Sequence, residues 1–126
     1  MPQLQKRGKW VFGWVRVHPG RKIVIPPDAF CEYGFRTGST IAFTQGSRRS
    51  GGIGIGLMGK MPSRLNTRVF ASGKIENNGE VVLPVDPKIK TGDRLLVVRG
   101  SGYALGFLAY GPIFELALHY GKLAEF

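Results

Sequence analysis

The chain has 126 residues, and its 18 Lys and Arg against 8 Asp and Glu give a formal net charge of +10. This length suits one compact domain with an adequate core, and a hydrophobic content of 43% argues against general disorder. No run of about 18 apolar residues is present to span a bilayer, and the first ten residues lack the apolar stretch of a signal peptide. We therefore expect a cytoplasmic protein without a membrane partner. The only cysteine, Cys31, excludes an internal disulfide and a cysteine-pair metal site, and we expect it to fill the core.

The chain opens with a predicted β-hairpin that is followed by a short helix. Residues 10–17 and 22–25 are runs of β-branched and aromatic residues, and the turn signal His18-Pro19-Gly20 separates them. The next segment, residues 27–33, has room for about two turns of helix, and Gly34 is a typical helix end.

A second hairpin follows, and the same kinds of strand then return. Residues 39–45 and 51–57 form this hairpin around a Gly-Ser turn. Later in the chain, Asn78-Gly79 is a strong hairpin signal, and residues 93–99 and 103–109 form a further pair of strands.

Residues 112–124 predict an amphipathic helix, which Gly121 weakens. Its apolar residues recur with helical spacing, and an exposed stripe of them would favour aggregation. We therefore expect the stripe either to cover an open end of the β-structure or to form a homodimer seam. The stripe consists of Ile113, Leu116, Ala117, Tyr120 and Leu123.

The two halves of the chain repeat one another. Residues 11–26, VFGWVRVHPGRKIVIP, return 58 positions later as VFASGKIENNGEVVLP at 69–84. After these segments the order is kept, since residues 37–43 match 91–97. The second half has only residues 85–90 where the first half has its predicted helix, so at most one helical turn fits there. The chain is therefore one β-rich unit written twice.

A single unit of this size is too small to stand alone. A lone hairpin is marginal in water and leaves its strand edges open, whereas two interlocked units pair those edges and bury both apolar faces. We therefore predict one pseudo-two-fold barrel domain over residues 1–126. It is divided into repeat 1 (10–59), a linker (60–68), repeat 2 (69–111) and a C-terminal helix (112–124).

The motif shared by the two halves resembles the AbrB-type (SpoVT-AbrB) swapped-hairpin domain of bacterial and archaeal regulators. It stands as Arg21–Pro26 with Thr37–Phe43, and again as Gly79–Pro84 with Thr91–Val97. The resemblance implies an all-β, swapped-hairpin (cradle-loop) barrel, closed here by two internal repeats within one chain. A double-psi barrel, which threads similar halves differently, remains an alternative. The resemblance also implies a DNA-binding transcriptional regulator.

The positive charge lies almost entirely in the first half. Residues 1–70 hold twelve Lys and Arg against Asp28 and Glu32, which leaves +10, whereas residues 71–126 balance six cations with six acids. Solubility alone does not require this asymmetry. Each neutralised phosphate of a polyanion releases counterions, so the first half predicts a nucleic-acid partner, above all double-stranded DNA.

The AbrB resemblance selects Arg16 and Lys22 as DNA contacts, with Arg21 beside them. Lys74 is nearly alone in the second half, because the counterpart of Lys22 is Glu80. We therefore expect a one-sided surface that contacts phosphates rather than a two-fold reader of base sequence. The full set of predicted nucleic-acid-binding residues is Arg16, Arg21, Lys22, Arg48, Arg49, Arg64 and Arg68.

The first predicted strand also carries alternating aromatic residues. Trp10, Phe12 and Trp14 alternate with smaller residues, so at least one aromatic side chain should face outward or toward a partner. A stacking platform for single-stranded DNA or RNA is one use of such a face, and core packing or a protein interface is the commoner one.

The sequence offers no constellation that indicates catalysis, a metal or a cofactor. The G-x-G-x-x-G match at residues 54–59 does not open a helix, which a dinucleotide site would need. His18 and His119 have no third ligand at metal spacing. We therefore expect no enzyme, no cofactor and no metal. A protein-interaction module, antitoxin-like or an assembly partner using the C-terminal helix, is the second reading, and a small barrel enzyme is the third.

Overall fold

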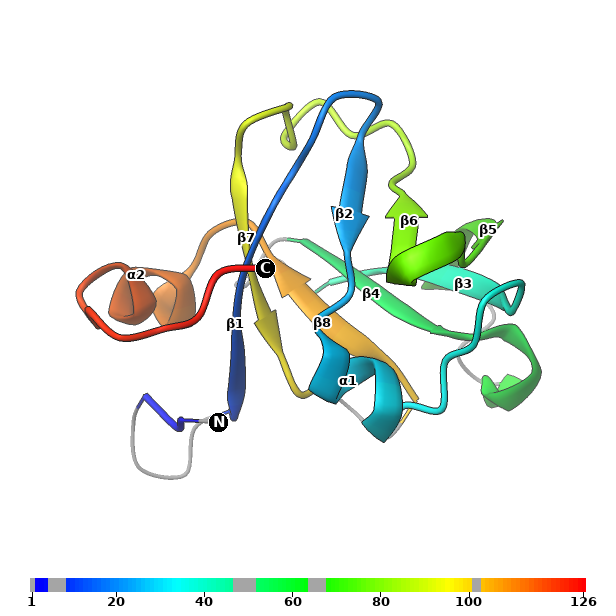
Figure 1. Ribbon diagram of the computed structural model, residues 1–126, viewed down its shortest axis with the longest axis horizontal. Coiled ribbons are helices and arrows are strands. Elements are labelled where there is room, and N and C mark those ends of the chain that lie inside the picture. Colours follow the sequence, from blue (N-terminus) through cyan, green and yellow to red (C-terminus); the bar gives the residue numbers. More distant parts are fainter. Residues whose placement is uncertain (1, 5–8, 47–51, 64–67, 101–102) are drawn as a thin grey trace.

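The computed structural model describes residues 2–4, 9–46, 52–63, 68–100 and 103–126 (Figure 1). This part of the chain is mostly β-structure with two α-helices, as predicted. The strands are β1 (Val11–Arg16), β2 (Lys22–Val24), β3 (Thr40–Gln45), β4 (Gly52–Leu57), β5 (Val69–Lys74), β6 (Glu80–Val82), β7 (Arg94–Val98) and β8 (Leu105–Leu108). The helices are α1 (Pro27–Glu32), α2 (Pro112–Leu118) and the short 3-10 turns η1 (Met58–Lys60) and η3 (Asn77–Gly79).

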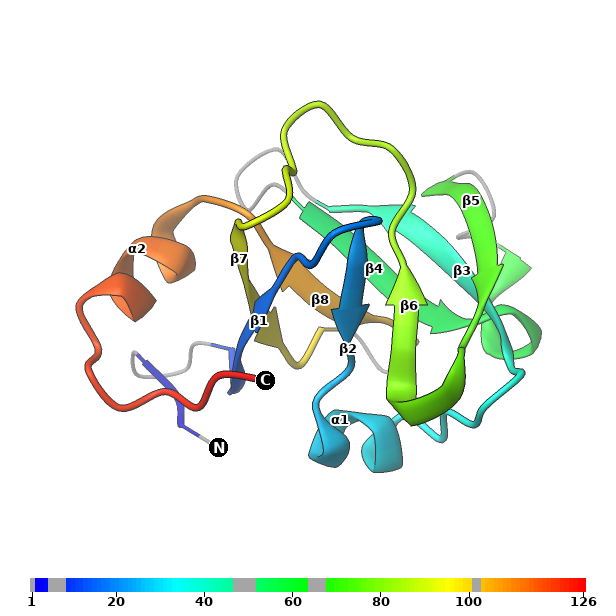
Figure 2. The same ribbon diagram turned by 45° about the horizontal axis from the view of Figure 1, so that its top comes forward.

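Strands of the two halves are exchanged. Six strands form one antiparallel sheet in the order β1-β7-β8-β4-β3-β5, so each half lends its first strand to the other half. The remaining strands, β2 and β6, pair with each other in a two-stranded ribbon. Figure 2 shows this ribbon lying across the six-stranded sheet.

The strand registers follow the sequence repeat. Ile23 pairs with its own counterpart Val81 at the centre of the ribbon, and Gly54 pairs with its counterpart Gly106 at the centre of the sheet. The turns before β3 and β7 match as well, because Gly38 N–H donates to Ile75 O and Gly92 N–H donates to Val17 O, both at 2.7 Å. The two halves are therefore related by a pseudo-two-fold axis through these central pairs.

The predicted closure into a barrel is wrong. Among the described residues no ladder joins β2 to β1 or β6 to β5, so the ribbon and the sheet remain separate. Both ribbon strands have only three residues and run toward a proline, Pro26 or Pro84, which has no N–H to extend a ladder. Neither edge strand, β1 or β5, is therefore joined to the ribbon by a ladder.

The main core lies between the sheet and the ribbon. Its buried residues come from both halves in matched pairs, such as Ile23 with Val81 and Ile25 with Leu83. A second, smaller core lies on the outer face of β1, β7 and β8, where α2 covers it. That core contains Val11, Trp14, Leu96, Val98, Leu108 and Ala117.

A β-bulge divides the first strand between these two cores. The register of β1 against β7 shifts between Val11 and Gly13, so Phe12 packs on the main core while Trp14 joins the outer one. Trp14 is only 4% exposed, and Trp10 is 42% exposed. The outward-facing aromatic residue that the sequence predicts is therefore Trp10, and the bulge removes the simple alternation.

The predicted helix at 112–124 is correct in position and wrong in length. α2 ends at Leu118, and the segment 119–126, called the tail below, continues without helical structure. The helix covers the outer face of the sheet rather than an open barrel end. Its Phe114 ring meets the Trp14 ring edge-on, with ring centres 5.2 Å apart.

The first helix, α1, is confirmed, and no helix stands at its counterpart. Pro27 occupies its first turn, where a missing N–H costs nothing, and Gly34 follows it with φ of 70°. Residues 85–90, all of them described, form turns only.

The prediction that Cys31 fills the core is wrong, because α1 buries Ala29 and leaves Cys31 exposed. Neither helix of the described chain is long and apolar enough to cross a membrane.

Candidate nucleic-acid interface

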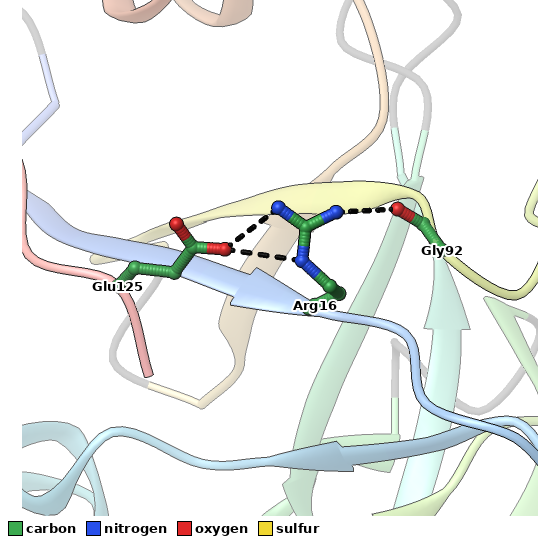
Figure 3. A network of polar contacts seen from close by, with 3 residues as sticks. All are labelled: Arg16, Gly92 and Glu125. Atoms are coloured by element: carbon green, nitrogen blue, oxygen red, sulfur yellow. Dashed lines mark hydrogen bonds and ion pairs between the residues drawn. The ribbon is translucent and has the colours of Figure 1, made fainter.

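Arg16, at the end of β1, is held by contacts within the protein (Figure 3). Its Nε and Nη2 donate to Glu125 Oε1 at 3.2 and 2.9 Å, and its Nη1 donates to Gly92 O at 2.8 Å. Both side chains of the ion pair are 45% exposed, so solvent screens the pair, and we expect it to contribute about 1 kcal/mol or less. Arg16 therefore connects three segments of the chain, and its charge is already paired.

The carboxylate reaches Arg16 because the tail runs beside β1 as a short parallel strand. Trp14 N–H donates to Ala124 O and Phe126 N–H donates to Trp14 O, both at 2.8 Å. The approach depends on Gly13, whose φ is 145°, since a Cβ there would lie 2.4 Å from Ala124 O. The tail thus supplies hydrogen bonds to a strand edge that the open barrel leaves unpaired.

Arg21 lies in the turn between β1 and β2. Its φ of 60° is unusual for a residue with a side chain, and its counterpart in the second half is Gly79 with φ of 73°. Its Nε donates to Leu83 O at 3.0 Å, the only hydrogen bond of this guanidinium among the described residues. The turn therefore presents a strained and exposed arginine whose terminal nitrogens are available to a partner.

Lys22, the first residue of β2, is adjacent to this arginine. Its Nζ lies 3.8 Å from Glu76 Oε1, and the two side chains are about half exposed. A pair this long and this exposed contributes roughly 0–1 kcal/mol, so a phosphate oxygen would compete with Glu76 for the ammonium. Arg21 and Lys22 form the turn cations, the one adjacent pair of predicted residues that the structure describes.

The other predicted residues do not join this pair. Arg68 is exposed directly before β5, at the opposite edge of the sheet from Arg16. The remaining three, Arg48, Arg49 and Arg64, lie outside the described residues. Lys74, which we expect to matter less, is exposed at the end of β5, opposite Thr40. The sequence analysis did not select three further exposed first-half cations, Lys9, Arg36 and Lys60, because no motif marks them.

The three described ion pairs all connect one half to the other. Arg16 pairs with Glu125, Lys22 with Glu76, and Glu32 of the first half with Arg99 of the second. The hydrogen bond from Arg99 holds the pKa of Glu32 below its ordinary value and raises the pKa of Arg99. Because Glu32 is one of only two acids in residues 1–70, this pair removes half of the negative charge available to offset the basic half.

The described residues contain no group of three or more His, Cys, Asp and Glu side chains that could hold a metal ion. Open hollows mark the surface of the described residues. One of about 420 Å³ is lined by Phe70 and Tyr110 together with residues 85–88. A smaller one, about 330 Å³, follows β5.

Comparison with protein-family models, with curated proteins and with solved structures found no match for this chain.

Proposed function

We propose that the protein is a DNA-binding regulator of AbrB type and that the turn cations, Arg21 and Lys22, meet the phosphate backbone. The observation that carries this proposal is the uncompensated charge of the first half. Among the described residues, only Glu125 and Glu76 of the second half pair with cations of the first half, whose net charge is +10, and both pairs are exposed. Such a surface attracts a polyanion through counterion release.

The position of the turn cations suits phosphate contact. They stand on a tight turn between two strands whose ends are fixed by backbone hydrogen bonds, His18 N–H to Lys22 O and Leu83 N–H to Arg21 O, each at 2.8 Å. A rigid turn loses little freedom on binding. Gly79 and Glu80 stand at the counterpart positions, so contact is one-sided and supports affinity rather than base-specific reading.

The observed architecture is consistent with this family. Exchange of β1 and β5 between the halves is the arrangement that a swapped-hairpin unit written twice would give. In this proposal Arg68 and, from the sequence, Arg48, Arg49 and Arg64 extend the basic surface. Arg16 contributes indirectly, since its guanidinium is engaged by Glu125 and Gly92.

A binding titration against salt tests the proposal. The parent, an Arg21→Gly/Lys22→Ala variant and a Lys74→Ala control are titrated with labelled duplex, single-stranded DNA and RNA by fluorescence anisotropy. Glycine is chosen at position 21 because its counterpart Gly79 has the same backbone conformation. Loss of two phosphate contacts should flatten the slope of log affinity against log salt by about 1.8 on duplex DNA.

Two outcomes would contradict the proposal. Equal losses in the double variant and in Lys74→Ala would rule out one-sided contact. No measurable affinity of the parent for any of the three nucleic acids at low salt would remove the assignment itself.

A protein-interaction module is the second candidate, and one observation favours it. α2 packs Ala117 inward but leaves Leu116 and Leu118 exposed, and Tyr120 of the tail is exposed beside them. Self-association that a Leu116→Ser/Leu118→Ser variant abolishes, measured by sedimentation, would support a homodimer through this helix.

A further inference from the structure

The tail reveals how an edge strand of this fold binds an extended segment. Trp14 faces Leu96 of β7 in a register that turns its backbone N–H and C=O away from β7, and both groups bond to the tail. Arg16, two residues after Trp14, donates to the side-chain carboxylate of Glu125 in the tail. Figures 1 and 2 both place the end of the tail beside β1.

The second half contains the same edge without a tail. Ser72 of β5 is the counterpart of Trp14 and faces Ala42, the counterpart of Leu96, so the two strands share one register. The backbone N–H and C=O of Ser72 therefore point away from β3. Within the described ranges no backbone group bonds to them. Lys74 takes the place of Arg16 and is exposed, with no acid paired to it in those ranges.

A hollow of about 330 Å³ follows this edge. Ser72 to Lys74 of β5 line one side, and Val82, the last residue of β6, lines the other together with Leu83 and Pro84. We call this hollow the β5 seam. Its residues are the counterparts of β1 residues 14–16 and of residues 24–26, and in the first half the tail is bonded to this part of β1.

The seam is free of the obstruction that makes Gly13 necessary in β1. Ala71 stands at the counterpart position, and its side chain packs against the main core. It lacks the positive φ that would turn its Cβ outward in the way shown for Gly13. A second chain can therefore approach Ser72 without a glycine beneath it.

From this correspondence we infer that the β5 seam binds an extended segment of a partner protein, whose acidic side chain pairs with Lys74 as Glu125 pairs with Arg16. The segment forms a parallel strand that bonds to the N–H and C=O of Ser72, and an apolar residue contacts the partly exposed Val82 and Pro84. This inference is independent of nucleic-acid binding, since it uses neither turn cation.

The chemistry of the seam favours a peptide over the other occupants. Unpaired backbone donor and acceptor groups on one strand edge match a polypeptide backbone, whereas a phosphate would find only Lys74, with Glu76 close by in the same hollow. The protein's own tail is already bonded to Trp14. A partner segment needs no such contact to be broken.

Binding of an amidated hexapeptide with the sequence of residues 121–126, Gly-Lys-Leu-Ala-Glu-Phe, tests the inference. The readout is amide chemical-shift change in the labelled full chain, together with the dissociation constant. We expect changes centred on residues 72–74 and 82–84. Lys74→Ala should weaken binding about threefold to fivefold, as expected for one exposed ion pair. The Glu→Gln peptide should lose as much on the parent and nothing further on Lys74→Ala.

A Lys90→Ala variant is the matched control, because Lys90 is an exposed second-half lysine away from the seam. Lys74→Glu with a Glu→Lys peptide should restore binding. Absence of binding, or shift changes centred on residues 13–16, would overturn the inference. So would self-association that Glu125→Gln abolishes, since a second copy would then occupy the seam. A loss of DNA affinity in Lys74→Ala matching that of the turn-cation variant would assign Lys74 to nucleic acid instead.

Discussion

The two edges of the six-stranded sheet are built from repeated sequence and finished differently. At the β1 edge the tail adds a strand, Glu125 pairs with Arg16, and α1 stands after the proline. At the β5 edge the described residues add neither a strand nor a helix. A repeat therefore fixes the exchanged strands, while the segments added outside the repeat decide which edge is stable and which is open to a partner.

The bulged phenylalanines show the same difference within the sheet. Both β1 and β5 have a register shift, at Phe12 and at Phe70 respectively. Phe12 packs on the main core, whereas Phe70 is 43% exposed beside Val85, which is 76% exposed. Residues 85–88, which stand in the sequence where α1 stands in the first half, line a hollow of about 420 Å³ together with Phe70.

Removing α2 and the tail from the β1 edge should have the largest effect on stability. Deletion of residues 112–126 uncovers Trp14 and Leu108, and it also takes away the strand partner of Trp14. We expect a loss on the order of 3 kcal/mol or more in the free energy of unfolding, since each large apolar side chain contributes about 1.5–3 kcal/mol when buried. Urea denaturation measures it. An unchanged, monomeric variant would show that neither α2 nor the tail stabilises the sheet.

A single methyl group at Gly13 should act on the same edge with a smaller effect. Gly13→Ala combines a φ of 145° with a Cβ only 2.4 Å from Ala124 O, so the tail must move away from β1. We expect a loss of roughly 1–3 kcal/mol by urea denaturation. Gly121→Ala is the control, because a Cβ there meets no described atom within 4 Å. Equal losses in the two variants would show that pairing of the tail with β1 does not stabilise the protein.

The Glu32–Arg99 pair connects α1 to the second half. Its loss should have the smallest effect on stability, and this effect should depend on pH. The pKa of Glu32 is lowered from its ordinary 4.5, mainly by the hydrogen bond from Arg99. A lowered folded-state pKa stabilises the folded protein above pH 4.5, and this contribution is lost as the pH falls through the folded-state pKa. Glu32→Gln should therefore be less stable than the parent at neutral pH.

Thermal unfolding of both proteins at several pH values tests this prediction. Their melting temperatures should converge in acid and separate above pH 4.5. A difference that stays constant across the whole range would mean that the ionised carboxylate contributes nothing and that only the shape of the side chain matters.

The proposed nucleic-acid surface was predictable only in part. The AbrB resemblance selected Lys22 with Arg21 beside it, and these two residues are adjacent in sequence and therefore adjacent in space. It also selected Arg16, whose guanidinium is engaged by a residue 109 positions later, a contact that no local pattern could reveal. At the opposite edge, the sequence analysis gave Lys74 a minor role. The role proposed for it here depends on the unpaired backbone of the neighbouring Ser72, which the sequence does not reveal.

The sequence by itself determined the β-rich class, the repeat, the turn positions and the short helix α1, because hydrophobic periodicity and Gly, Pro and Asn signals act over a few residues. Tertiary structure decided that the barrel stays open, that α2 stops at Leu118, and that the tail runs beside β1. Those outcomes depend on which backbone groups remain unpaired once distant strands have met, and on bulges that change which face a side chain takes. Neither is a property of any local stretch of sequence.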